Sequence, residues 1–150
     1  MPTCYVTCGF PGCGKSTYVV ENLLDDNTVR VSFDGMVHSV NRKIIKDFSK
    51  LYSTLENETM SFALHNKFNL IIDKTNLSSK KRTSLIGRLK SQGYKVVVVF
   101  FDTPEEVYRA RNTQRDKQFI VPDHVYEMFN KHYVPPSIEE GMDEILTVKE

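Results

Sequence analysis

The residues with the most chemistry in this sequence lie between positions 9 and 17. They read Gly-Phe-Pro-Gly-Cys-Gly-Lys-Ser-Thr and fit the spacing GxxxxGK[ST]. Glycines in such a loop let backbone N–H groups turn inward around a phosphate. The lysine then reaches the β- and γ-phosphates, and the serine holds Mg²⁺. The pattern predicts a loop that binds nucleotide phosphates and Mg²⁺ through Gly9, Pro11, Gly12, Cys13, Gly14, Lys15, Ser16 and Thr17.

Two carboxylates follow short β-rich runs. Residues 29–33 deliver Asp34, and the apolar run 69–73 ends in Asp73. Residues just past the carboxyl end of a strand face the ligand crevice of an open α/β sheet. Asp34 is either a catalytic carboxylate there or the N-cap of the next helix. Asp73 fits the pattern of an aspartate carried toward Mg²⁺, with Thr75 and Asn76 on the same edge.

Basic residues gather in two later segments. The first is a helix from about 79 to 92 that opens with Lys80, Lys81 and Arg82. Such a run is either a solvated face or a contact for a phosphate-rich partner. The second is a helix from Pro104 that carries Arg109, Arg111 and Arg115. It predicts a lid that brings arginines over the transferring phosphate, with surface salt bridging as the alternative.

The elements that must position these residues alternate along the chain. Strands are expected at 4–8, 29–33, 69–73, 95–101 and 145–148. Helices are expected at 16–25, over most of 36–68, and after Ser78, Pro104 and Pro122. In the last helix Val125, Met128 and Phe129 are expected to point inward. The uniformly apolar run 95–101 should be a central strand that is covered on both faces. We expect one α/β domain over residues 1–150, a parallel sheet with helices on both faces and a helical lid.

Composition narrows the class of protein. With 150 residues, 40% hydrophobic, 26% charged and a net charge of +1, the sequence is typical of a globular protein with no global basic field. No apolar run suggests a membrane span or signal peptide, so an intracellular, cytoplasmic location without membrane contact is expected. The three cysteines contain no CxxC pair, which favours a reducing compartment. Cys13 is either a small residue that fits the loop or a thiolate open to oxidation.

Four segments together resemble polynucleotide 5′-hydroxyl kinases, both the bacteriophage enzymes and the kinase domain of the animal kinase-phosphatases. They are GFPGCGKST, IIDKTNL, FFDTPEEVYRARNTQR and IVPDHVYEMFNKHYVPPSIEEGMDEI. The resemblance spans nearly the whole chain. It implies an ATP- and Mg²⁺-dependent P-loop kinase that phosphorylates the 5′-hydroxyl of single-stranded or end-exposed DNA or RNA, in nucleic-acid repair.

The resemblance also assigns roles to residues. Asp34 matches the general base, and Asp73 matches a carboxylate beside metal and substrate. Thr75 and Asn76 match residues on the acceptor side. Arg115 matches the lid arginine at the transferring phosphate, with Arg111 supporting it. Lys80, Lys81 and Arg82 become candidate contacts to acceptor phosphates.

The sequence departs from the family in places. It reads Ser32-Phe33-Asp34 where the family has Asn-Arg-Asp, and Val37 where phage members have an arginine. It has no DxDGT signature, so no 3′-phosphatase activity is expected. Two other functions stay open: a kinase of the same fold for a small alcohol, nucleoside or tRNA-linked acceptor, and a nucleotide-regulated binding protein.

Overall fold

The predicted motifs are carried by a five-stranded parallel sheet. In the computed structural model, which describes residues 1–32, 48–117 and 120–149, the strands run in the order β2-β3-β1-β4-β5. They are β1 (Thr3–Cys8), β2 (Thr28–Ser32), β3 (Asn69–Asp73), β4 (Lys95–Asp102) and β5 (Glu144–Lys149). All four neighbouring pairs are parallel. The expected α/β fold is confirmed, and all five strands lie close to their predicted positions.

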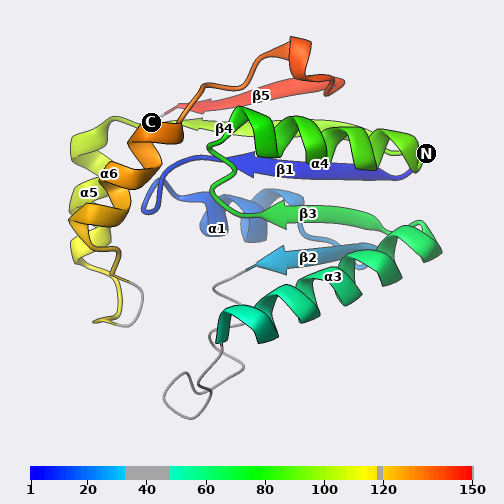
Figure 1. The fold of residues 1–150 in the computed structure, drawn as a ribbon, viewed down its shortest axis with the longest axis horizontal. Helices are drawn as coiled ribbons and strands as arrows, with labels where there is room; N and C mark the ends of the chain where they lie inside the picture. The colour runs from blue at the N-terminus through cyan, green and yellow to red at the C-terminus, as the bar shows by residue number, and fades with distance from the viewer. Residues whose placement is uncertain (33–47, 118–119, 150) are drawn as a thin grey trace.

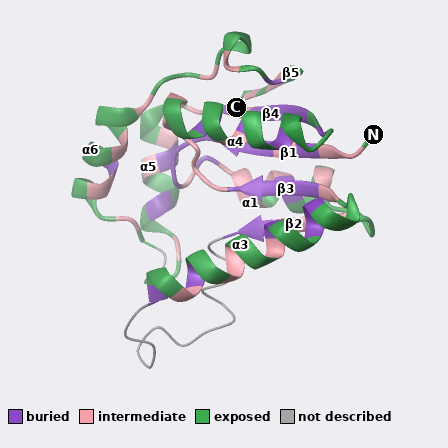
Figure 2. Ribbon diagram, turned by 45° about the vertical axis from the view of Figure 1, so that its right-hand side comes forward, coloured by how far each residue is buried: buried purple, intermediate pink, exposed green. Residues whose placement is uncertain are grey.

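The middle of the sheet is built from apolar runs. β1 lies between β3 and β4, and β4 lies between β1 and β5. The valines of β4 from Val96 to Val99 are all buried, as a strand covered on both faces requires. Figure 2 shows the inner strands buried, while α3, α4 and α6 keep exposed residues on their outer sides.

Helices cover both faces of the sheet. In Figure 1, α3 (Phe48–Asn66) and α4 (Ser79–Ser91) lie in front of the strands, and α1 (Lys15–Tyr18) lies behind them. The predicted helix at 16–25 is divided, because α1 continues as the π-helix η1 (Val19–Leu23). Ser78 caps α4 by accepting a hydrogen bond from the Lys81 N–H, as its position in the sequence suggests.

Two further helices stand beyond the carboxyl ends of the strands (Figure 1). They are α5 (Glu105–Thr113) and α6 (Asp123–His132), and a short 3₁₀ turn, η3 (Ile138–Glu140), leads from there to β5. The prediction that Met128 points inward is wrong, since Met128 is 50% exposed. Tyr126 is the buried residue of α6 instead, because its ring packs against Tyr108 of α5.

Candidate active site

The phosphate-binding loop joins β1 to α1 and is shaped by two left-handed glycines. Gly12 has φ 89° and Gly14, at the N-cap of α1, has φ 92°. Only glycine adopts this backbone freely, which explains the two glycines at these positions. The Gly9 N–H donates to the Thr75 carbonyl at 3.0 Å, so the loop is tied to the segment after β3. The loop and the Asp73–Asn76 segment therefore form one edge of the site.

Gly12 is also needed because of its neighbours. A Cβ built on Gly12 would collide with the backbone carbonyl of Tyr108. We expect Gly12→Ala to lower the free energy of unfolding by about 1–3 kcal/mol, since a strained backbone adds to the clash. Denaturant unfolding measures the change. The matched control is Gly87→Ala in α4, where a Cβ meets nothing within 4 Å and where alanine should be stabilising by up to about 1 kcal/mol. Equal stability of the two variants would contradict this account.

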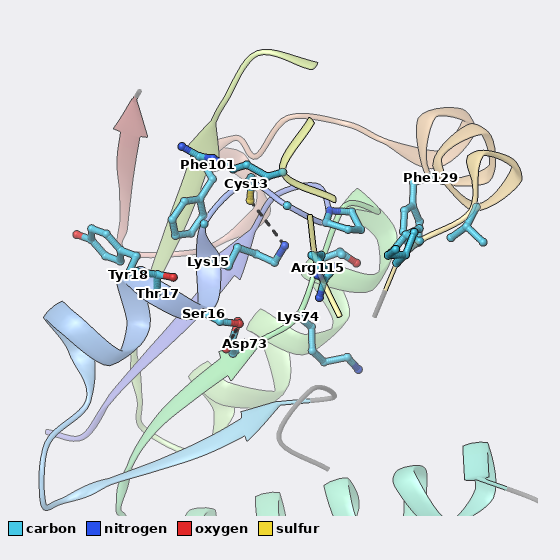
Figure 3. A pocket seen from close by; sticks show the side chains of 18 of the residues that line it. Cys13, Lys15, Ser16, Thr17, Tyr18, Asp73, Lys74, Phe101, Arg115 and Phe129 are labelled. Atoms are coloured by element: carbon cyan, nitrogen blue, oxygen red, sulfur yellow. Dashed lines mark hydrogen bonds between the residues drawn. The ribbon is translucent and has the colours of Figure 1, made fainter. Parts of the chain in front are cut away.

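The side chain of Lys15 is folded back onto its own loop. Its Nζ donates to the carbonyls of Gly9 and Phe10, at 3.0 Å each. It also donates to Cys13 Sγ at 3.6 Å, the contact drawn in Figure 3. These carbonyls are acceptors that phosphate oxygens would replace. Nearby, burial raises the pKa of the Cys8 thiol to about 11, although the positive charges of Arg82 and Lys15 oppose this shift.

The predicted metal-binding pair is brought together. Ser16 Oγ donates to Asp73 Oδ2 at 3.4 Å, across 57 residues of sequence. The Asp73 side chain is only 2% exposed, and Arg30 contacts the same oxygen through Nη2 at 2.6 Å and Nε at 3.1 Å. A hydroxyl and a carboxylate are oxygen ligands of the kind Mg²⁺ prefers. No cluster of three or more acidic, histidine or cysteine ligands occurs in the parts of the chain that the structure describes. Ser16 and Asp73 therefore fit a Mg²⁺ ion that would also take ligands from nucleotide phosphates.

A cavity of about 940 Å³ connects these groups. Figure 3 shows it extending from Tyr18 and Phe101, past the loop, to Lys74 and Phe129. Its lining includes the loop from Pro11 to Thr17, the segment Asp73–Thr75, both lid arginines, and a set of apolar or aromatic side chains, namely Tyr52, Ile120, Val121, Pro122, Val125 and Phe129. The predicted ATP-binding residues thus line one space, except Gly9, which is buried at its edge and anchors the loop.

The lid is docked on the loop by aromatic rings. Phe10 stacks on Tyr108 at 5.0 Å between ring centroids, Tyr108 stacks on Tyr126 at 5.7 Å, and the Tyr126 hydroxyl donates to the Pro11 carbonyl at 2.7 Å. Burial, with a smaller contribution from Glu105, raises the pKa of Tyr108 to about 12. This stack fixes α5 and α6 relative to the phosphate-binding loop.

The three arginines of the lid segment divide into two kinds. Arg111 and Arg115 both line the cavity. Arg109 makes surface ion pairs with Glu105 and Asp123, each at 3.1 Å, which is the salt-bridging alternative. The Asn112 side chain donates to the Val121 carbonyl at 2.8 Å and accepts from the Val121 N–H at 2.9 Å. These two bonds hold the end of α5 against the residues just before α6.

Of the residues predicted to bind the acceptor, some line the cavity and others do not. Thr75 lines the cavity. The Asn76 side chain instead donates to the Thr7 carbonyl at 2.8 Å, and its backbone is left-handed with φ 43°. Lys80 is exposed on α4 and does not line the cavity. Asp34, the predicted base, and Val37 lie outside the described residues.

The prediction that Arg82 contacts acceptor phosphates is contradicted. Its guanidinium is 0% exposed and forms a paired contact with the Glu140 carboxylate, with Nε and Nη2 each at 2.8 Å from one oxygen. Its remaining donors reach the carbonyls of Asn76 and Val134 at 2.8 and 2.6 Å. The guanidinium is therefore enclosed in the fold, and its role is to hold the loop after β3 against the segment that leads to β5.

Sequence reasoning missed Tyr52 and Lys74, which line the cavity, and Glu56, which pairs with Lys74. Lys74 Nζ pairs with Glu56 of α3 at 3.0 Å and lies 5.7 Å from the centre of the Tyr52 ring. Lys74 adjoins Asp73 in the sequence, which was a usable signal. Tyr52 and Glu56 gave none, because only the packing of α3 brings them to the end of β3.

Comparison with known proteins places the chain in a family. The model of the AAA_33 family, described as an AAA domain, matches residues 5–136. A protein of Acanthamoeba polyphaga mimivirus, whose name proposes a bifunctional polynucleotide phosphatase/kinase, is 31% identical over 149 residues, or 95% of this chain and 32% of that protein. L-seryl-tRNA(Sec) kinase of Methanococcus maripaludis is 25% identical over 150 residues, covering 92% of this chain and 55% of that protein. The chain thus spans only about a third to a half of these curated relatives.

Solved structures support the same fold. One from Chloroflexus aurantiacus, whose title proposes a kinase, superposes with a TM-score of 0.64 at 17% identity, covering 99% of this chain and 85% of that one. Within the described residues, no helix is both long and apolar enough to cross a membrane. Because the family model matches most of its length, the chain belongs to the AAA_33 family and has the fold of a P-loop kinase.

Proposed function

We propose that this protein transfers the γ-phosphate of ATP to the 5′-hydroxyl of a DNA or RNA end. The observation that carries the proposal is the continuous cavity that joins Lys15, Ser16, Asp73 and Arg115 to a separate wall made largely of aromatic and aliphatic side chains. A phosphoryl donor and a bulky acceptor require such a shared space. The name of the mimivirus relative supports the same acceptor class.

The position of each residue in the cavity suggests its role in the proposed reaction. The loop N–H groups and Lys15 hold the phosphates, and Ser16 and Asp73 hold the metal ion. Arg111 and Arg115 offset the charge on the moving phosphoryl group. Asp34 stays the proposed base for the attacking hydroxyl, because it follows β2, whose last residue Ser32 pairs in register with Asp73. When bound, ATP would supply the transferable phosphoryl group, and Mg²⁺ would offset the charge on its oxygens.

The acceptor wall favours a nucleotide over a sugar. Tyr52, Val125 and Phe129 offer aromatic and aliphatic surface, and Lys74, which is paired with Glu56, lies over the Tyr52 ring. A base stacked on an aromatic side chain gains about 1–3 kcal/mol without sequence preference, whereas a free sugar needs many polar partners. This chemistry suits a terminal nucleotide of unspecified sequence.

A second acceptor has a specific observation in its favour. The tRNA kinase of Methanococcus maripaludis aligns with 92% of this chain. A seryl group at the end of a tRNA also presents a hydroxyl next to a nucleotide. The same cavity would then receive the amino acid and the terminal adenosine.

Transfer of labelled γ-phosphate tests the proposal. We expect label from ATP on oligonucleotides that end in a 5′-hydroxyl, no label on the same oligonucleotides with a 5′-phosphate, and loss of transfer when Mg²⁺ is chelated. Seryl-tRNA, a nucleoside and gluconate serve as competing acceptors. Transfer to any of these that persists in a large excess of 5′-hydroxyl oligonucleotide would overturn the polynucleotide assignment and leave the kinase chemistry in place.

A further inference from the structure

The candidate metal-site carboxylate already has a cationic partner. Arg30 on β2 donates to Asp73 Oδ2 through Nη2 at 2.6 Å and Nε at 3.1 Å, and Ser16 Oγ contacts that oxygen at 3.4 Å. Asp73 is almost completely enclosed, whereas the Arg30 side chain is 25% exposed. Three donors therefore converge on one oxygen of a nearly buried carboxylate.

The strand register explains why Arg30 reaches this position. β2 and β3 are parallel, with Ser32 opposite Asp73 and Arg30 opposite Ile71. Residues two apart on a strand share a face, so Arg30 lies on the same face as Ser32. Its long side chain then extends along β3 to the carboxylate at the strand end. The contact is built into the sheet rather than into a loop.

The charge on Asp73 requires such a partner. A buried carboxylate is tolerated when a cation and hydrogen bonds accompany it. Among the other cations that line the cavity, Lys15 directs its ammonium to the carbonyls of Gly9 and Phe10, and Lys74 pairs with Glu56. Arg30 therefore neutralises Asp73 in the arrangement that the structure shows.

We propose that Arg30 is a positioning residue that acts as the resident counter-cation of Asp73. It holds the carboxylate beside Ser16 before a divalent cation arrives, and its charge weakens binding of that cation to the nucleotide-free protein. Divalent binding is thereby coupled to the nucleotide, whose phosphates supply the missing negative charge. The inference rests on the proposed metal role of Ser16 and Asp73.

Three variants separate charge from hydrogen bonding. Arg30→Gln removes the charge but leaves an amide donor, Arg30→Lys keeps the charge without the two-donor grip, and Asp73→Asn removes the carboxylate. We expect Arg30→Gln to bind Mn²⁺ without nucleotide about tenfold more tightly or better, because an adjacent opposite charge changes the cation affinity of a carboxylate by at least that factor. Arg30→Lys should bind Mn²⁺ like the wild type. Arg30→Gln and Arg30→Lys should each lower kcat for phosphoryl transfer more than they raise KM for ATP, because the Asp73 carboxylate is less well held.

Mn²⁺ titration followed by electron paramagnetic resonance measures the affinity, with and without a non-hydrolysable ATP analogue. If Arg30→Gln binds Mn²⁺ like the wild type while Asp73→Asn loses the analogue-dependent binding, the counter-cation role of Arg30 is overturned and the metal site stands. If Asp73→Asn also behaves like the wild type, the proposed metal site itself fails. Should Arg30→Gln not fold, Arg30→Lys decides the matter, since an unchanged kcat in that variant overturns the positioning role.

Discussion

Replacing Lys15 with methionine is expected to lower phosphoryl transfer by about 10³-fold, because the loss of a charged donor at the transferring phosphate removes transition-state stabilisation of that size. Lys15 is now held by the Gly9 and Phe10 carbonyls. Its ammonium must leave them for phosphate oxygens, so the side chain contributes to nucleotide binding rather than to an ion pair within the fold. Transfer to a 5′-hydroxyl oligonucleotide measures the loss, and nucleotide-induced thermal stabilisation measures binding.

The matched variant is Asp34→Asn, which should separate binding from chemistry. A general base contributes about 10²–10⁴-fold to rate but does not hold the nucleotide. We therefore expect Asp34→Asn to lose transfer and keep thermal stabilisation by Mg·ATP, whereas Lys15→Met loses both. Full activity of the Lys15 variant would contradict the assignment of the loop. Full transfer activity of the Asp34 variant would show that another group is the base.

The sequence was sufficient for the parts of the site that follow strands. The loop motif, Ser16 and Asp73 were predictable because a parallel sheet gathers the carboxyl ends of its strands at one edge. The loop between β1 and α1 then brings Ser16, in the first turn of α1, to 3.4 Å from Asp73 at the end of β3. Arg111 and Arg115 were predictable in the same way, since they follow β4: Arg111 lies on α5, and Arg115 lies just past the end of that helix.

The remainder depends on contacts between distant elements. Arg82 belongs to a run of basic residues that is typical of an exposed helix face. Its buried ion-pair partner, Glu140, lies 58 residues later in the sequence, in the 3₁₀ turn η3. Arg30 is one charge in a short strand, and its role emerges only when β2 pairs with β3. Tyr126, and not Met128, faces the core because the aromatic stack with Tyr108 fixes the rotation of α6. The local sequence pattern predicts the helices and strands. It does not predict which side chains from different helices and strands contact one another, because packing of the whole fold decides those contacts.

Replacing Arg82 with methionine is expected to lower the free energy of unfolding by about 3–5 kcal/mol, because breaking a buried ion pair leaves an uncompensated charge. The carboxylate of Glu140 is 7% exposed and would lose two hydrogen bonds at 2.8 Å. For a chain of this length the melting temperature should fall by about 6–20 °C. The matched control is Lys80→Met, which removes the same charge from an exposed position two residues away and should change stability by less than about 0.5 kcal/mol.

Acid pH and a second substitution test whether the buried charge is the cause. Desolvation alone would raise the pKa of Glu140, but the hydrogen bonds and charge of Arg82 outweigh it and hold the pKa below the usual carboxyl value. The stabilisation from this pair is therefore present above the unfolded-state pKa and is lost as pH falls through the lower folded-state pKa. In Arg82→Met, protonation removes the uncompensated charge of Glu140, so the stability difference from the wild type should shrink as pH falls.

The double variant Arg82→Met/Glu140→Leu should recover much of the lost stability at neutral pH, since apolar replacement of a whole buried pair is often neutral. The ion pair would be ruled out as the cause if the double variant were as unstable as Arg82→Met and if the stability difference between Arg82→Met and the wild type did not change with pH. The packing of the arginine stem and its hydrogen bonds to the Asn76 and Val134 carbonyls would then hold this part of the site together.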